Sequence, residues 1–116
     1  MKEAVGKVFS IAGDNRPVPG CTVSKAICDG ENSVSIFSLD EQTDISAKIY
    51  PYHKLLIVAD GRLEVYRSGG NARTLGNGEA LLTETDIPVG MRTSTGAVYT
   101  EIEIRRTDVT NGTQKR

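Results

Sequence analysis

Short runs of apolar and β-branched residues recur along this chain about every ten residues, and glycine, proline, aspartate or asparagine turn signals separate them. Such spacing is typical of all-β sandwiches and barrels, and helical periodicity of apolar residues is hard to find anywhere in the sequence. The pattern therefore predicts an antiparallel β architecture. The expected strands are Val8–Ile11, Thr22–Cys28, Ser33–Leu39, Ile45–Tyr50, Lys54–Ala59, Leu63–Tyr66, Glu79–Thr83 and Ala97–Ile104.

The length of 116 residues suits one domain with a single hydrophobic core. Within it we expect residues 1–32 to supply N-terminal strands that complete a barrel, residues 33–105 to form the core, and residues 106–116 to form a flexible polar tail. Apolar residues make up 38% of the chain, which argues against disorder of the whole molecule.

Charge and apolar patterning exclude several classes of partner. The formal net charge is −1, from 14 basic and 15 acidic residues, so no long-range field recruits nucleic acid or an anionic membrane. Because no apolar run is long enough for a membrane span or a signal peptide, we expect a cytoplasmic protein. In that compartment Cys21 and Cys28 are expected to be reduced.

Two of the expected strands indicate what covers the sheets. Leu55–Val58 is apolar at four successive positions, which predicts that the strand is covered on both sides, either by neighbours from the opposite sheet or by a subunit partner. In the last strand Glu101 and Glu103 alternate with isoleucines, so we expect the two glutamates to face solvent.

Three stretches of the sequence resemble the framework of the small single-domain cupins. "IVADGRLEVY" is similar to the hairpin of the first cupin motif, "GNGEALLTETDIPVGM" to the segment of the second motif, and "SVSIFSLDEQTDIS" to the strand that precedes the first motif. The resemblance covers residues 33–104. It implies an all-β, cupin-type double-stranded β-helix of two antiparallel sheets and, since cupins commonly dimerise, a homodimer.

The resemblance does not extend to the metal ligands of the cupin motifs. Gly61 and Gly78 match the glycines that anchor the two motifs. The histidine and glutamate slots fall on Lys48, Tyr50, Lys54 and Val89. An ammonium group and a valine side chain offer no lone pair to a metal ion at neutral pH. We therefore expect no metal at this position and no cofactor.

Lys48, Tyr50 and Lys54 suggest a different ligand for the barrel interior. If the cupin register holds, all three side chains aim into the barrel mouth together with Val89. Two cations and a phenol would suit a small anion such as a carboxylate or a phosphate ester. Alternatively, the lysines extend to solvent or pair with an acid such as Glu84 or Asp86.

His53 is the only histidine in the chain. It lies one residue before Lys54, so the two-residue period of a strand predicts that its side chain points away from the barrel interior. It could be a ligand or base displaced from the metal position, with Asp44 or Glu84 as partner. Our interpretation is the other one, a histidine at a loop edge or a subunit contact.

Two functions from different classes follow from these residues. The preferred hypothesis is a metal-free binding or regulatory module that holds a small, anionic metabolite. The alternative is a metal-independent isomerase or epimerase of a sugar or an acid, with Tyr50, Lys48 or Lys54 as acid/base groups.

Overall fold

The computed structural model describes residues 3–67 and 71–105, which form nine β-strands and no helix, so none of these residues lies in a helix that could cross a membrane. The expected polar tail lies outside the described residues. The strands are β1 (Thr22–Cys28), β2 (Ser33–Leu39), β3 (Thr43–Ile49), β4 (His53–Gly61), β5 (Leu63–Arg67), β6 (Arg73–Leu75), β7 (Ala80–Leu82), β8 (Pro88–Thr93) and β9 (Ala97–Ile104).

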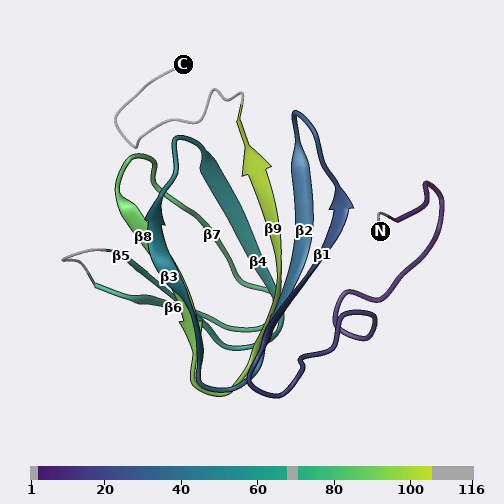
Figure 1. Ribbon diagram of the computed structural model, residues 1–116, viewed down its shortest axis with the longest axis horizontal. Coiled ribbons are helices and arrows are strands. Elements are labelled where there is room, and N and C mark those ends of the chain that lie inside the picture. The colour runs from purple at the N-terminus through teal and green to yellow at the C-terminus, as the bar shows by residue number, and fades with distance from the viewer. Residues whose placement is uncertain (1–2, 68–70, 106–116) are drawn as a thin grey trace.

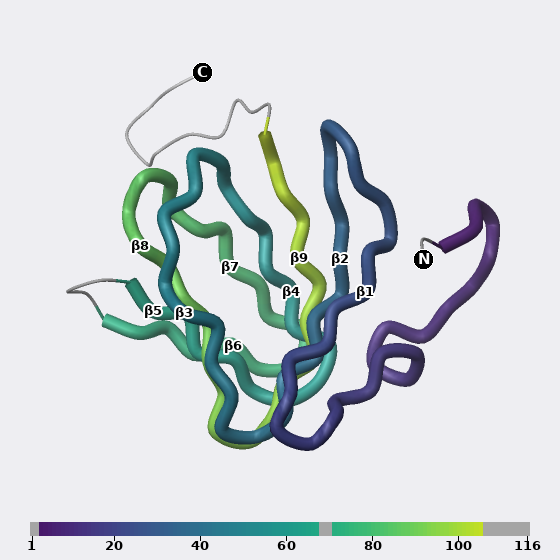
Figure 2. The backbone as a smooth tube through the Cα atoms, viewed as in Figure 1, coloured from purple at the N-terminus to yellow at the C-terminus, as the bar shows by residue number. Residues whose placement is uncertain are grey.

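The strands pair into two antiparallel sheets that face one another (Figure 1). One sheet has the order β1-β2-β9-β4-β7, and the other has the order β3-β8-β5-β6. The chain crosses between the sheets after β2, β3, β4, β6, β7 and β8. Figure 2 shows that the two sheets approach one another at one end and diverge at the other. The molecule is thus a sandwich that is closed at one end.

The strand predictions were confirmed for most of the chain and wrong at three places. Residues 8–11, expected as an opening strand, lie outside the sheets. The strands β6 and β8 were not expected. Because β8 begins with a proline and contains Gly90, both of which disfavour strands, its sequence resembles a turn.

Inward-facing side chains of both sheets fill the core. Leu56 and Val58 of β4, Tyr99 of β9, and Leu63 and Met91 from the other sheet are almost completely buried. Burying one side chain of this kind contributes about 1.5–3 kcal/mol. The ring of Tyr99 also stacks on Phe37, with 5.4 Å between centroids. This core fixes which face of each strand points inward.

The outer face of the larger sheet is covered over only part of its width. Asn15, in the segment before β1, is buried there and donates its amide to Val23 O, Ile36 O and Ser38 Oγ. On β4 the outward-facing Leu55 and Ile57 are half-buried. The subunit partner that would complete their burial, and with it the homodimer, stays a prediction that sedimentation velocity of the purified protein would test.

Candidate functional site

A buried ion pair lies on the inner face of the larger sheet. Lys54 Nζ is 3.1 Å from Glu101 Oε2, and both side chains are less than 10% exposed. The register of β4 and β9 places Leu56 opposite Glu101 and Lys54 opposite Glu103, so the two charged residues are diagonal neighbours. The expectation that Glu101 faces solvent was wrong: the alternation has the correct phase, but the same face of β9 carries the core residues Ala97 and Tyr99, so Glu101 points inward, where Lys54 pairs with its charge.

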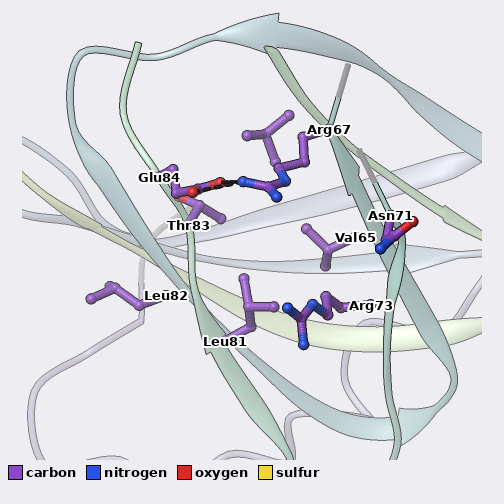
Figure 3. Close-up of a pocket in the computed structure, with 9 residues that line it drawn as sticks. Val65, Arg67, Asn71, Arg73, Leu81, Leu82, Thr83 and Glu84 are labelled. Carbon is purple, nitrogen blue, oxygen red and sulfur yellow. Dashed lines mark hydrogen bonds and ion pairs between the residues drawn. The ribbon is translucent and has the colours of Figure 1, made fainter. Parts of the chain in front are cut away.

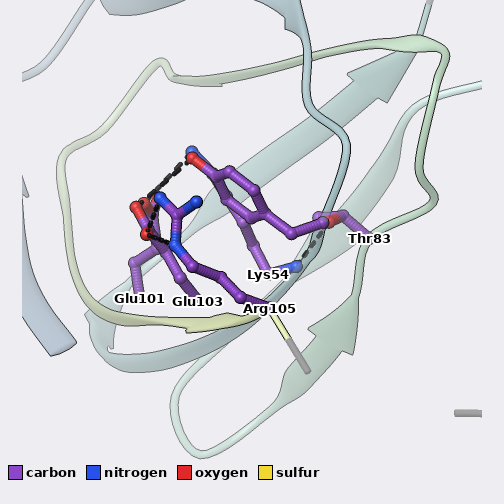
Figure 4. Close-up of polar contacts among 6 residues, drawn as sticks. Lys54, Thr83, Glu101, Glu103 and Arg105 are labelled. Carbon is purple, nitrogen blue, oxygen red and sulfur yellow. Dashed lines mark hydrogen bonds and ion pairs between the residues drawn. The ribbon is translucent and has the colours of Figure 1, made fainter. Parts of the chain in front are cut away.

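Tyr50 and Thr83 enclose Lys54. Lys54 Nζ lies 3.6 Å from the centroid of the Tyr50 ring, a favourable cation–π arrangement. The backbone N–H of Lys54 donates to Thr83 Oγ1 at 2.9 Å (Figure 4). Two of the predicted site residues, Tyr50 and Lys54, therefore do come together. The partner of Lys54 is Glu101 rather than Glu84 or Asp86.

A second set of polar contacts surrounds Glu103, two residues after Glu101 on β9. Glu103 accepts hydrogen bonds from Arg105 Nη2 at 2.6 Å and from the Tyr52 hydroxyl at 3.4 Å, and Figure 4 shows Arg105 beside Glu103. The Arg105 guanidinium lies over the Tyr52 ring. Glu103 is thus half-buried rather than fully solvated, which corrects the second of the two glutamate expectations.

Burial governs the protonation of the cluster. Loss of hydration raises the pKa of Glu101, and the attraction of the Lys54 ammonium offsets this only in part. Burial also raises the pKa of Tyr99, so its phenol stays protonated at neutral pH. Tyr99 Oη and Glu101 Oε1 are buried without a hydrogen-bond partner among the described residues. Such atoms lower stability because their hydration is lost without compensation.

The unpaired hydroxyl leads to a test by substitution. We expect Tyr99→Phe to raise the free energy of unfolding by about 1 kcal/mol, because it removes a buried group that has no partner. The matched control is Tyr66→Phe, whose hydroxyl donates to Asp44 Oδ1 at 2.7 Å and whose loss should cost about 1 kcal/mol. Urea denaturation measures both changes. A loss in Tyr99→Phe as large as that in Tyr66→Phe would contradict the unpaired state.

Lys48 and Val89, the other two predicted site residues, lie on the facing sheet. They are opposite one another in the register of β3 and β8, and Arg67 of β5 is the next residue in the same row. Val89 is buried in the core, whereas Lys48 is exposed. Lys48 thus lies in the same row as Val89, with its side chain exposed, and among the described residues it forms no ion pair.

A pocket of about 330 Å³ opens between β5 and β6 on one side and β7 on the other (Figure 3). Its apolar wall is formed by Val65, Leu81 and Val89. The remaining residues that line it are Arg67, Asn71, Arg73, Leu82, Thr83 and Glu84. Val89 and Thr83 connect the pocket with the predicted site, because Val89 is one of the cupin slots and Thr83 contacts Lys54.

Two arginines of this pocket differ in their partners. Arg67 Nη1 donates to both carboxylate oxygens of Glu84, at 2.6 and 2.7 Å. Arg73 lies opposite Val65 in the register of β5 and β6 and so faces inward, and within residues 3–67 and 71–105 it has no acidic partner. Sequence reasoning missed Arg73 because β6 has only three residues and no alternation to reveal it.

His53 lies outside this group of residues. Its Nδ1 is 2.7 Å from the carbonyl oxygen of Thr83. Asp44 and Glu84, the partners considered for a displaced base, contact Tyr66 and Arg67 instead. His53 therefore contacts the backbone of Thr83 and has no acidic partner within residues 3–67 and 71–105, and its place outside the site stays a prediction.

The residues at the cupin metal position do not fit a metal ion. Lys54 is an ammonium already paired with a carboxylate, and Val89 has no donor atom. Elsewhere in the described part of the chain, no three His, Cys, Asp or Glu side chains gather as ligands, and Cys21 and Cys28 are free and exposed.

Two antiparallel sheets, joined face to face by a chain that crosses repeatedly between them, define the fold as a cupin-type double-stranded β-helix. This confirms the fold that the sequence resemblance implied. The likeness to solved structures of this fold extends over most of the chain.

Comparison with solved structures supports this assignment of the fold. A conserved protein of unknown function from Streptococcus pyogenes has a TM-score of 0.83 at 13% identity, over 92% of this chain and 94% of its own. A protein with a double-stranded β-helix domain from Klebsiella pneumoniae has a TM-score of 0.73 at 16% identity, over 85% and 90%. A cupin superfamily protein from Desulfitobacterium hafniense has a TM-score of 0.70 at 14% identity, over 86% and 100%. No family model and no curated protein matches the sequence.

Proposed function

We propose that this protein is a metal-free binding module for a small anionic molecule, which it holds in the pocket between β5, β6 and β7. The balance of charge around the barrel interior carries the proposal. The carboxylates of Glu84, Glu101 and Glu103 each pair with one cation. Among the described residues Lys48 and Arg73 have no acidic partner, and the exposed Asp86 beside Tyr50 has no cationic one, so this region has an excess of one positive charge.

Arg73 is the cation best placed to use that excess. The side chains of Arg73 and Lys48 are both exposed, but Arg73 borders the pocket beside the apolar wall, whereas Lys48 does not line it. A guanidinium offers two parallel N–H donors that match the two oxygens of a carboxylate. The pocket volume lies at the lower end of the range for small-molecule sites, about 300–1,000 Å³. A small anion is therefore the ligand that this geometry favours.

The test is a titration of ¹⁵N-labelled protein with phosphate, gluconate and hexanoate. At least one of these anions is expected to cause saturable shifts at the amides of Val65, Leu81 and Val89. Arg73→Met should weaken that binding by about tenfold or more, because it removes a charged hydrogen-bond donor. Arg16→Met is the matched control, since Arg16 is exposed and lies outside the pocket.

Two results would contradict the proposal. One is the absence of saturable shifts with every anion of the series. The other is an equal affinity in the Arg73→Met and Arg16→Met variants, because the pocket cation would then contribute nothing.

The alternative, a metal-independent isomerase or epimerase, has less support from the geometry. A general acid or base must reach the substrate. Lys54 is buried, ion-paired with Glu101 and covered by Tyr50, and Lys48 is exposed. These contacts favour a structural role for Lys54.

A further inference from the structure

The lining of the pocket divides into a polar rim and an apolar wall. Val65 and Val89 are buried and Leu81 is half-buried, and the side chains of all three border the same space. Figure 3 shows Arg73 beside Leu81 and Val65, with Asn71 on the same side as Arg73 and with Thr83 and Glu84 opposite. The cation and the apolar wall are thus adjacent, and a ligand that contacts one also contacts the other.

The charge available to a ligand is close to one unit. Arg67 already donates to both oxygens of Glu84, so its charge is compensated before a ligand binds. Arg73 is the cation of the pocket that has no acidic partner in the described part of the chain. A monoanion would be neutralised by Arg73, whereas a phosphate ester, which carries more negative charge, would be neutralised only in part.

The apolar wall determines which kind of carbon skeleton the ligand can have. Hydroxyl groups placed against Val65, Leu81 and Val89 would lose their hydration without gaining a hydrogen bond, which is unfavourable. Methylene or aromatic carbons placed there would instead gain from burial. The wall therefore disfavours a polyhydroxylated sugar acid.

From these two requirements we infer that the ligand is a small monocarboxylate with an apolar body, of the short-chain fatty acid or aromatic acid class. Its carboxylate pairs with Arg73, and its body packs on Val65, Leu81 and Val89. This inference rests on the proposed anion-binding function and adds the chemical class of the ligand.

Isothermal titration calorimetry with matched probes tests the class. Hexanoate should bind at least tenfold more tightly than gluconate, which has the same number of carbons but carries hydroxyls, and at least tenfold more tightly than the uncharged hexanol. Acetate, butyrate and hexanoate should gain about tenfold in affinity for each two methylene groups. This series uses the unaltered protein, so it does not depend on the folding of any variant.

Two variants then test which residues contact the carboxylate of the ligand and which contact its apolar part. Arg73→Met should abolish the preference for hexanoate over hexanol, and Leu81→Asn should remove the dependence on chain length, with thermal denaturation as the check on folding. If gluconate or phosphate binds in the pocket and hexanoate does not, the ligand class is overturned while the anion-binding function stands. If no anion binds, both fall. Equal affinity for hexanoate and hexanol would also overturn the inference.

Discussion

The variant Lys54→Met is expected to lose about 3 to 5 kcal/mol of its free energy of unfolding at neutral pH, because it leaves a carboxylate buried without its counter-charge. Lys54 and Glu101 are both buried, and no other cation is within ion-pair distance of Glu101 among the described residues. Chemical denaturation monitored by circular dichroism measures the loss. A change below about 1 kcal/mol would show that the pair is open to solvent.

The loss should depend on pH in a defined direction. Burial raises the pKa of native Glu101 above its unfolded value, so the native state binds that proton more tightly. The resulting contribution to stability is complete below the unfolded pKa and is lost as the pH rises through the native pKa. Removing the Lys54 ammonium raises the native pKa further. The penalty of Lys54→Met should therefore be smaller at about pH 4 than at about pH 8.

A double variant separates loss of the pair from loss of packing. Lys54→Met combined with Glu101→Leu replaces both charges by apolar groups, and we expect its stability to lie within about 1 kcal/mol of the unaltered protein. Each single variant should be less stable than the double variant. If the two losses simply add, the residues do not interact and the double variant is the least stable of the three.

The variant Gly61→Ala is expected to be destabilised by about 3 kcal/mol or more, because both its backbone angle and its surroundings require glycine. Gly61 has a φ of +92° at the end of β4. A Cβ atom at this position would lie 2.2 Å from the carbonyl oxygen of Gly96 and 3.0 Å from Ala97 Cα. Since these are backbone atoms, the two chain segments would have to separate.

Gly78→Ala is the matched control for this clash. Gly78 also has a positive φ, +79°, but no atom lies within 4 Å of a Cβ placed there. Its substitution should cost about 1 kcal/mol, from the backbone angle alone. Thermal unfolding of the two variants compares them directly. Equal losses would mean that the contact between Gly61 and Gly96 contributes nothing.

The sequence predicted strand bounds best where apolar and polar residues alternate within a single strand and turn residues flank it. The bounds of β1, β2 and β9 were predicted residue for residue, because each strand lies between clear turn signals. Val8–Ile11 failed for the opposite reason: its composition favours a strand, but no neighbouring strand pairs with it. Strand propensity depends on a partner that the local sequence does not reveal.

The candidate site was harder to predict because it depends on register between distant strands. The spacing of the cupin motifs predicted that Tyr50 and Lys54 lie near one another, and these two side chains are in contact. The partner of Lys54 could not be predicted, because Glu101 is distant in sequence and becomes a neighbour of Lys54 only through the pairing of β4 with β9. The one signal in the sequence was a charged residue on an inward-facing position of each strand, which requires a partner of opposite charge. Arg73 gave no such signal, because β6 is too short to show which way its side chains point.

The contact between Gly61 and Gly96 also limits where a related sequence can accept an insertion. Arg62 alone separates β4 from β5, and its N–H donates to the carbonyl oxygen of Gly96 at the closed end of the sandwich. An inserted residue there would break this contact. The connection from β7 to β8 is longer and contributes Thr83 and Glu84 to the pocket. Homologous proteins that bind other ligands are therefore expected to differ in the length of the loop after Leu82 and to keep the one-residue link at Arg62.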